Sequence, residues 1–153
     1  MIREATEDEA STVSERLAAE IANAGYSYVA PPGGAIRMDI AAGHLWFIDD
    51  AEPRVVMHAY RDYGKVLNTN GSTLFEGTVA YVDHVWGPSL RHEELLRWLA
   101  NHLWLRWGDL YGVYPRGNPI ANKADAAIKP KRNGARSFVK LSVAASVLNA
   151  RVV

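Results

Sequence analysis

The apolar positions between residues 10 and 21 are spaced three or four residues apart, which predicts an amphipathic helix. Thr6 and Glu9 stand before this helix as a capping box, and Gly25 is placed to end it. Residues 1–5 are predicted to form a short strand that leads into the helix.

Four strands are predicted in the middle of the chain. In the first, the apolar side chains at 36, 38 and 40 alternate with Arg37 and Asp39. The longest is rich in β-branched and aromatic residues, contains no proline and follows a turn at residues 68–71. The predicted strands are 36–40, 45–48, 54–63 and 73–86.

A second helix is predicted after Pro88, with Ser89 as its N-cap and Gly108 at its end. Its leucine and tryptophan side chains form a broad apolar stripe. A strand over 110–114 follows, and then a short helix from Pro119 to Ala127, with proline at its first position.

The end of the chain is predicted to form a hairpin. Asn133-Gly134 favours a type I′ turn between arms at 128–132 and 135–143. The full order is β-α-β-β-β-β-α-β-α-β-β, which indicates a mixed α/β fold with a central mixed sheet flanked by helices and a C-terminal β-hairpin.

Composition excludes several classes of chemistry. The 153 residues include no cysteine, which removes disulfides, thiolate zinc sites and a cysteine nucleophile. The five histidines include no pair three or four residues apart, and any metal site would have to be assembled from distant elements, so we predict none. The charged start MIREATEDEA is unlike a signal peptide, and no run approaches 18 apolar residues. We therefore expect a cytoplasmic protein without a membrane span.

Charge is divided unevenly along a chain that is neutral overall. Residues 116–153 carry eight Lys and Arg side chains against the single carboxylate of Asp125. Such a basic end suits an anionic partner, which could be a cofactor phosphate, a nucleic acid or an acidic protein face. A solvated basic tail without a partner is the alternative.

The strand over 78–86, followed by Pro88 and a leucine-rich helix, resembles the central strand and cofactor-binding helix of the GCN5-related N-acetyltransferase (GNAT) superfamily. The strand over 110–114 and the following Asn118-Pro119-Ile120-Ala121 resemble the family's fifth strand and the Asn-x-x-Ala start of its next helix. The resemblance covers about residues 1–141. It implies a GNAT-like domain at 1–143 and an extension at 144–153 as a candidate partner contact.

The resemblance implies an acetyl-CoA site whose signature turn is altered. The family binds the CoA pyrophosphate with an Arg/Gln-x-x-Gly-x-Gly/Ala turn at a helix N-terminus. In the matching Arg91–Leu96 stretch, Glu94 and Leu96 stand where small residues belong, and two carboxylates at the helix start oppose a pyrophosphate. Asp125 also stands where many family members carry a tyrosine that protonates the leaving thiolate. The cofactor-binding residues implied by the resemblance are Val85, Arg91, Asn118 and Ala121.

By the same resemblance, the catalytic base would lie on the 73–86 strand, where Glu76, Asp83 and His84 are the titratable candidates. Asp83 and His84 are adjacent on a strand, so they point to opposite faces and cannot form a dyad by themselves. Asp83 is the better base candidate, since a carboxylate among apolar neighbours needs a reason. His84 could equally be a core histidine, and Tyr111 or Tyr114 could supply the acid missing at position 125.

Three functions follow as hypotheses. The first is an acyl-CoA-dependent N-acyltransferase with a degenerate pyrophosphate loop. The second is a non-catalytic GNAT-like phage virion or assembly protein, because eroded GNAT-like proteins of this size resemble this chain in their tryptophan-rich central helix; its location would then be the virion. The third is a nucleic-acid-binding or modifying protein. The tryptophan-rich helix and the apolar tail, which would be exposed in a monomer, favour a homo-oligomer or a protein partner.

Overall fold

The computed structural model describes residues 1–151, which pack as two compact units. The first comprises Met1–Tyr60 and His84–Pro88, and the second comprises Arg61–Asp83 and the chain from Ser89 onward. Hydrogen-bonded neighbours give a seven-stranded sheet in the order β1-β2-β3-β4-β5-β7-β6. Within residues 1–151, no helix is both long and apolar enough to cross a membrane.

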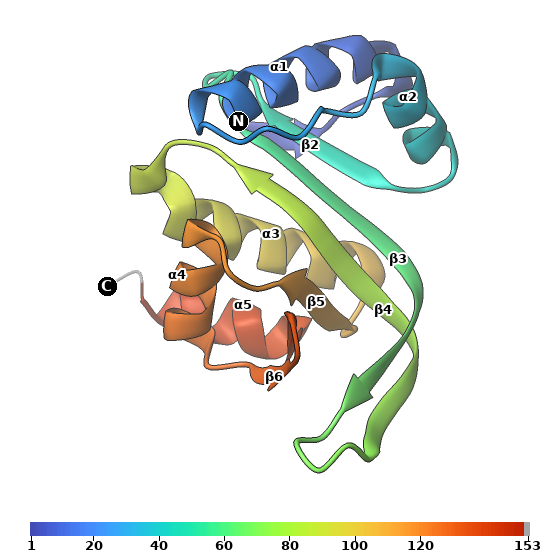
Figure 1. Ribbon diagram of the computed structural model, residues 1–153, viewed down its shortest axis with the longest axis vertical. Coiled ribbons are helices and arrows are strands. Elements are labelled where there is room, and N and C mark those ends of the chain that lie inside the picture. The colour runs from blue at the N-terminus through green and yellow to red at the C-terminus, as the bar shows by residue number, and fades with distance from the viewer. Residues whose placement is uncertain (152–153) are drawn as a thin grey trace. The chain divides into compact units, whose positions relative to one another are not determined.

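The first unit contains two helices packed on a short antiparallel sheet (Figure 1). Its elements are β1 (Ile2–Glu4), a 3₁₀ turn (Glu7–Glu9), α1 (Ala10–Asn23), α2 (Gly33–Ala41), β2 (Leu45–Asp49), the first part of β3 (Val56–Leu67) and the end of β4 (Thr73–Trp86). The predicted capping box is confirmed, because the Thr6 N–H donates to the Glu9 carboxylate at 3.0 Å. Arg3 also donates to Glu9, and these hydrogen bonds lower the pKa of Glu9 to about 2.

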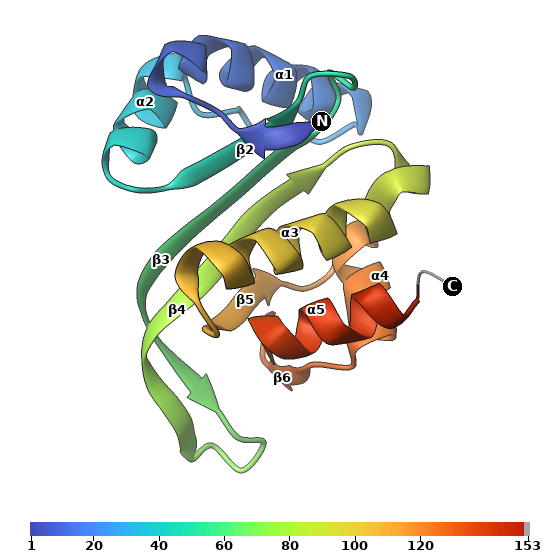
Figure 2. The same cartoon turned by 180° about the vertical axis from the view of Figure 1, so that it is seen from behind.

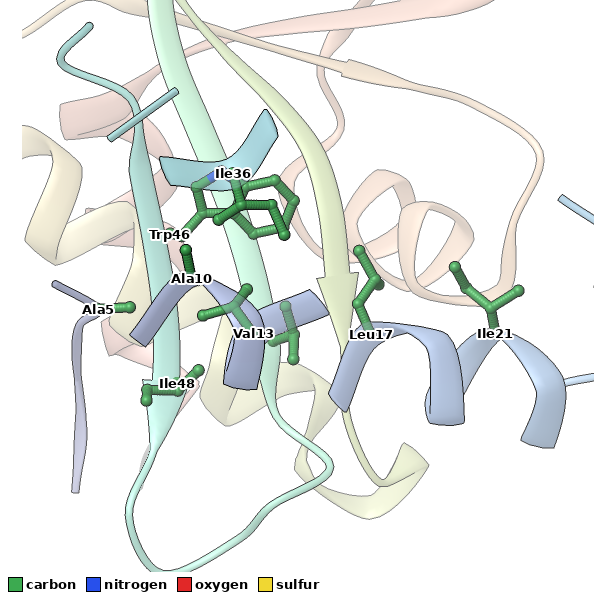
Figure 3. Close-up of a cluster of buried hydrophobic side chains, with 9 residues drawn as sticks. Ala5, Ala10, Val13, Leu17, Ile21, Ile36, Trp46 and Ile48 are labelled. Atoms are coloured by element: carbon green, nitrogen blue, oxygen red, sulfur yellow. The ribbon is translucent and has the colours of Figure 1, made fainter. Parts of the chain in front are cut away.

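The core of this unit lies between α1, α2 and β2 (Figure 3). Val13 and Leu17 of α1 are fully buried, as the helical spacing predicted. They pack in one cluster with Ile36 of α2 and with Trp46 and Ile48 of β2.

The predicted strand over 36–40 is wrong, because these residues belong to helix α2. Ile36 is fully buried whereas Met38 is 73% exposed, so the two side chains do not share one buried face. Ile36 and the half-buried Ile40 instead lie one helical turn apart and both pack on the core. Apolar residues at 36, 38 and 40 fit the two-residue period of a strand, and those at 36 and 40 also fit one turn of a helix. The helix is the form in which Ile36 and Ile40 pack in one cluster with Trp46.

The second unit carries the remaining elements. They are the end of β3, most of β4 (Thr73–Trp86), a 3₁₀ turn (Ser89–Arg91), α3 (His92–Trp107), β5 (Tyr111–Pro115), α4 (Pro119–Ile128), β6 (Lys131–Asn133), β7 (Arg136–Lys140) and α5 (Leu141–Ala150). β4 and β5 are parallel, whereas β7 pairs antiparallel with both β5 and β6. The predicted strand over 73–86 is confirmed, and the second helix has Arg91 rather than Ser89 as its N-cap.

The C-terminal segment differs from its prediction. Residues 141–150 form α5, which lies beside α3 in both views (Figures 1 and 2). Ala144, Ala145 and Leu148 are buried there, so the expectation that the apolar tail is exposed in a monomer is wrong for its described part, and the last two residues, 152–153, lie outside the described residues. The domain boundary at 143 and the partner contact of the extension stay predictions.

The predicted hairpin forms with a different turn. Asn133 pairs with Arg136, so Gly134 and Ala135 are the two central residues. Only Gly134 has a positive φ, of 58°, which is the pattern of a type II′ turn rather than the predicted type I′ turn.

Candidate functional site

Asn118 and Ala121, two predicted cofactor-binding residues, are brought together at the start of α4. The Asn118 side-chain oxygen accepts the Ala121 N–H at 2.8 Å, and Pro119 occupies the first helical position. This is the local structure that the sequence Asn-Pro-Ile-Ala favours. The oxygen of the amide is used by the cap, so its NH₂ group is the part that can donate to a ligand.

Asp125, further along α4, is the centre of a buried polar cluster. Its Oδ1 accepts hydrogen bonds from the Tyr114 hydroxyl at 2.8 Å and from the Ser137 hydroxyl at 3.0 Å. Arg116 and Arg132 lie 3.8 and 3.6 Å from Oδ2. The cluster therefore joins α4 to β5, β6 and β7.

The environment of Tyr114 makes its hydroxyl a poor acid. Burial, and then the hydrogen bond to Asp125, raise the pKa of Tyr114 well above its usual range. A proton held this strongly is not readily given to a leaving thiolate. Tyr114 therefore contacts Asp125, which stands at the position of the family's tyrosine, but this contact is a structural hydrogen bond and does not make Tyr114 an acid.

An open pocket of about 370 Å³ lies beside this cluster in the second unit. Its lining includes Arg116, Gly117, Asn122, Asp125, Ala126 and Arg132. The two guanidinium groups face one carboxylate, which leaves the lining with an excess positive charge. The basic end of the chain therefore provides a concave surface that suits a small anion.

The start of α3 carries the altered signature turn. Arg91 donates to Glu94 through two nitrogens, at 3.0 and 2.9 Å, and Arg151 donates to Glu93 at 2.7 Å. Each of the two carboxylates is thus paired with a guanidinium, and their charge at the helix start is balanced.

The base candidates on β4 lie in different surroundings. Glu76 is exposed, and its carboxylate contacts the Tyr63 hydroxyl and Lys65 Nζ, which lies 3.4 Å away. The Tyr63 hydrogen bond lowers the pKa of Glu76. Asp83 is also exposed, so its carboxylate is not buried among the apolar neighbours that the sequence pattern indicated. These two residues belong to the second unit, and His84 belongs to the first.

His84 is half-buried in an aromatic group of the first unit. Its ring lies 5.8 Å from the Trp46 ring and 6.3 Å from the Tyr28 ring, between centroids, and 6.1 Å from the buried His58 ring. The Trp86 indole N–H donates to His84 Nδ1 at 3.2 Å, so a neutral His84 carries its hydrogen on Nε2. Val85, one of the predicted cofactor-binding residues, belongs to the same unit.

Sequence reasoning missed His58 altogether. Burial, together with the charges of His84 and His44, lowers the pKa of His58 to about 3. His58 therefore stays neutral at physiological pH. Its neighbours come from β2, from the turn before β2 and from β4, and no sequence spacing indicated that these histidines would gather.

Comparison with known proteins identifies the fold. No family model and no curated protein matches the sequence. A solved structure of a mutant AtaT toxin, bound to the C-terminus of the antitoxin AtaR and acetyl-CoA, is similar over 99% of this chain and 97% of its own, with a TM-score of 0.57 and 9% identity. A second structure of the same AtaT mutant, bound to the AtaR C-terminus, is similar over 99% of this chain and 96% of its own, with a TM-score of 0.59 and 9% identity. The chain therefore has the fold of the GNAT acetyltransferases, the fold that its order of strands and helices predicted.

Proposed function

We propose that this chain is an acyl-CoA-dependent N-acyltransferase. The observation that carries the proposal is the likeness of fold, over nearly the whole chain, to a toxin solved with acetyl-CoA. Two local features of the second unit support it: β4 and β5 pair in parallel, and α4 starts at a capped Asn118. The phage virion alternative gains no support from the comparisons.

Residues of the second unit would hold coenzyme A. The Asn118 NH₂ group would donate to the pantetheine arm, and Arg91 with the N-terminal amides of α3 would hold the pyrophosphate. The sequence raised the objection that Glu93 and Glu94 repel such an anion. Their pairing with Arg151 and Arg91 weakens this objection, because neither carboxylate presents an uncompensated charge. When bound, acyl-CoA would supply an activated thioester.

Asp83 is the residue that we assign as the base. An incoming ammonium group must lose a proton before its nitrogen can attack, and an exposed carboxylate can accept that proton directly or through a water. Glu76 is a weaker candidate because the hydrogen bond from Tyr63 lowers the pKa of its carboxyl group, which makes the carboxylate a weaker base. His84 is weaker because its Nδ1 lone pair accepts the Trp86 N–H.

Binding is tested first, by calorimetric titration of the purified protein with acetyl-CoA and with free CoA at low salt. We expect micromolar affinity for both, weakened at least about tenfold in Arg91→Glu because the anion then meets a carboxylate. Lys65→Glu, a charge reversal on β3, is the matched control. A folded protein that gives no heat with either ligand contradicts the acyltransferase proposal.

Catalysis is tested with a panel of amines. Asp83→Asn should lower kcat by about 100-fold or more while acetyl-CoA binding is retained, because only proton removal is affected. Asp62→Asn, an exposed carboxylate of β3, should keep full activity. Equal activity of the Asp83→Asn variant and the unaltered protein would remove Asp83 from the base role.

A protein partner is a second part of the proposal. The two AtaT structures named above are complexes with the C-terminus of an antitoxin, which favours a peptide-like partner for this chain. The outward side of α3 supports it, since Trp104 is 43% and Leu105 is 89% exposed. The homo-oligomer stays a prediction. Light scattering at two protein concentrations, on the unaltered protein and on the Leu105→Glu variant, would test it.

Nucleic-acid binding stays the alternative. It rests on the basic residues near the C-terminal hairpin, of which Arg132 also faces Asp125. DNA binding should then fall steeply with salt and be lost on charge reversal at Lys131 and Arg132.

A further inference from the structure

Asp39 and His44 are brought together by the end of helix α2. The His44 N–H donates to the Asp39 carbonyl at 2.9 Å, and the Gly43 N–H donates to the Ile40 carbonyl at 3.0 Å. These two bonds form a Schellman motif, in which Gly43 takes the left-handed conformation with φ of 96°. The turn places the side chains of residues 39 and 44 close together, with Asp39 Oδ1 3.8 Å from His44 Nδ1.

His58 reaches the same place from β3. In the register of β2 with β3 it is the partner of Trp46, and the two rings stack with centroids 4.1 Å apart. His58 Nε2 lies 3.0 Å from His44 Nδ1. Two nitrogens at this distance share one hydrogen, so one ring must present a lone pair to the other.

The carboxylate and the rings are held by further contacts. Trp46 donates its indole N–H to Asp39 Oδ2 at 3.3 Å, which leaves Oδ1 as the oxygen near His44. The Tyr60 ring stacks on the His44 ring, with centroids 4.7 Å apart. Both rings and the carboxylate are thus oriented by neighbours, as metal ligands usually are.

We propose that Asp39, His44 and His58 bind a divalent transition-metal ion, with Zn²⁺ as the representative. One ligand atom from each residue lies within 4.8 Å of the other two. A tetrahedral Zn²⁺ with Zn–N distances of about 2.0–2.1 Å holds its ligand atoms about 3.3 Å apart, so the observed distances need only small side-chain adjustments. The shared hydrogen between the two rings would leave as the ion binds.

The donor set selects the class of ion. Two imidazoles and one carboxylate suit zinc and its transition-metal neighbours better than Mg²⁺ or Ca²⁺, which prefer oxygen. His58 is buried, whereas the side chains of His44 and Asp39 are 27% and 33% exposed, so an ion can enter from solvent. Three protein ligands leave a coordination position for water or a ligand.

This site goes beyond the proposed acyltransferase function and does not depend on it. All three ligands lie in the first unit, whereas Arg91, Asn118 and Asp83 lie in the second. The sequence prediction of no metal site relied on the absence of histidines three or four residues apart. The structure instead combines Asp39 and His44, five residues apart at the end of α2, with a third ligand, His58, from strand β3.

The test is a titration of EDTA-treated, dialysed protein with ZnCl₂ in the presence of a chromophoric zinc chelator, followed by thermal unfolding with and without Zn²⁺. We expect one equivalent bound, and at saturation a rise in Tm of at least about 5 °C. Asp39→Asn, His44→Gln and His58→Phe should each weaken binding at least about tenfold and remove the rise in Tm.

His92→Gln and His102→Gln are matched controls, because they remove histidines of α3 in the second unit. Both should bind Zn²⁺ like the unaltered protein. The proposal is overturned if the unaltered protein binds no zinc, or if the control variants lose as much affinity as the ligand variants. If His58→Phe does not fold, His44→Gln decides, because this half-buried turn residue can be replaced without opening the core.

Discussion

Asp125 offers the sharpest test of how the second unit is held together. In Asp125→Ala the hydroxyls of Tyr114 and Ser137 lose the acceptor that lies 2.8 and 3.0 Å from them. Each hydroxyl left unpaired in a buried place costs about 1–3 kcal/mol. The pairs with Arg116 and Arg132 add little, because these guanidinium groups are partly exposed and lie at 3.8 and 3.6 Å.

The expected loss of unfolding free energy for Asp125→Ala is therefore about 3–5 kcal/mol. Asp125→Asn should cost less, about 1–2 kcal/mol, because its amide oxygen can still accept from Tyr114 and Ser137. Urea denaturation followed by tryptophan fluorescence measures both values. A double-mutant cycle with Tyr114→Phe should give a coupling energy of about 1–2 kcal/mol, since the second change removes the unpaired hydroxyl.

Two results would refute this reasoning. One is a loss below about 1 kcal/mol for Asp125→Ala, which would mean that water replaces the carboxylate without cost. The other is an additive cycle, which would show that the Tyr114 hydroxyl gains nothing from Asp125. Either result would also reopen Tyr114 as a candidate acid.

Further predictions concern the ends of three helices. Gly43→Ala should destabilise by about 1 kcal/mol because of the positive φ, whereas Gly34→Ala in the same α2 helix, with open space at its Cβ, should be neutral or stabilising by up to about 1 kcal/mol in urea denaturation. Glu9 has a folded pKa of about 2 against 4.5, so its contribution is complete above about pH 4.5 and is lost as the pH falls toward 2; Glu9→Gln should flatten the fall in Tm over this range. Asn118→Ala should cost about 1 kcal/mol in urea denaturation through loss of the cap, and Asn118→Ser should restore most of it.

The features that the sequence predicted well are local ones. The Thr6–Glu9 capping box and the Asn118 cap form between residues three positions apart, so their hydrogen bonds depend only on neighbouring backbone. The β4 strand over 73–86 followed from its own composition. The order of elements and the resemblance of the 78–86 and 110–121 segments to the GNAT superfamily then predicted the fold, except that a strand was predicted where α2 stands and no helix was predicted at α5.

The sites depend on contacts between elements, and these the sequence could not show. Asp125 meets Tyr114 and Ser137 only because α4 packs on β5 and β7. Because a strand was predicted at 36–40, the end of helix α2, where Asp39 and His44 come together, was not foreseen.

The sequence by itself determined the Thr6–Glu9 capping box, the Asn118 cap and the long strand over 73–86, because each rests on residues that are close along the chain. Tertiary structure alone decided that residues 36–40 form a helix, since a short apolar segment fits either period until Ile36 packs beside Trp46. It also decided that His58 Nε2 lies 3.0 Å from His44 Nδ1. This distance depends on the register of β2 with β3, which pairs residues up to fourteen positions apart along the chain.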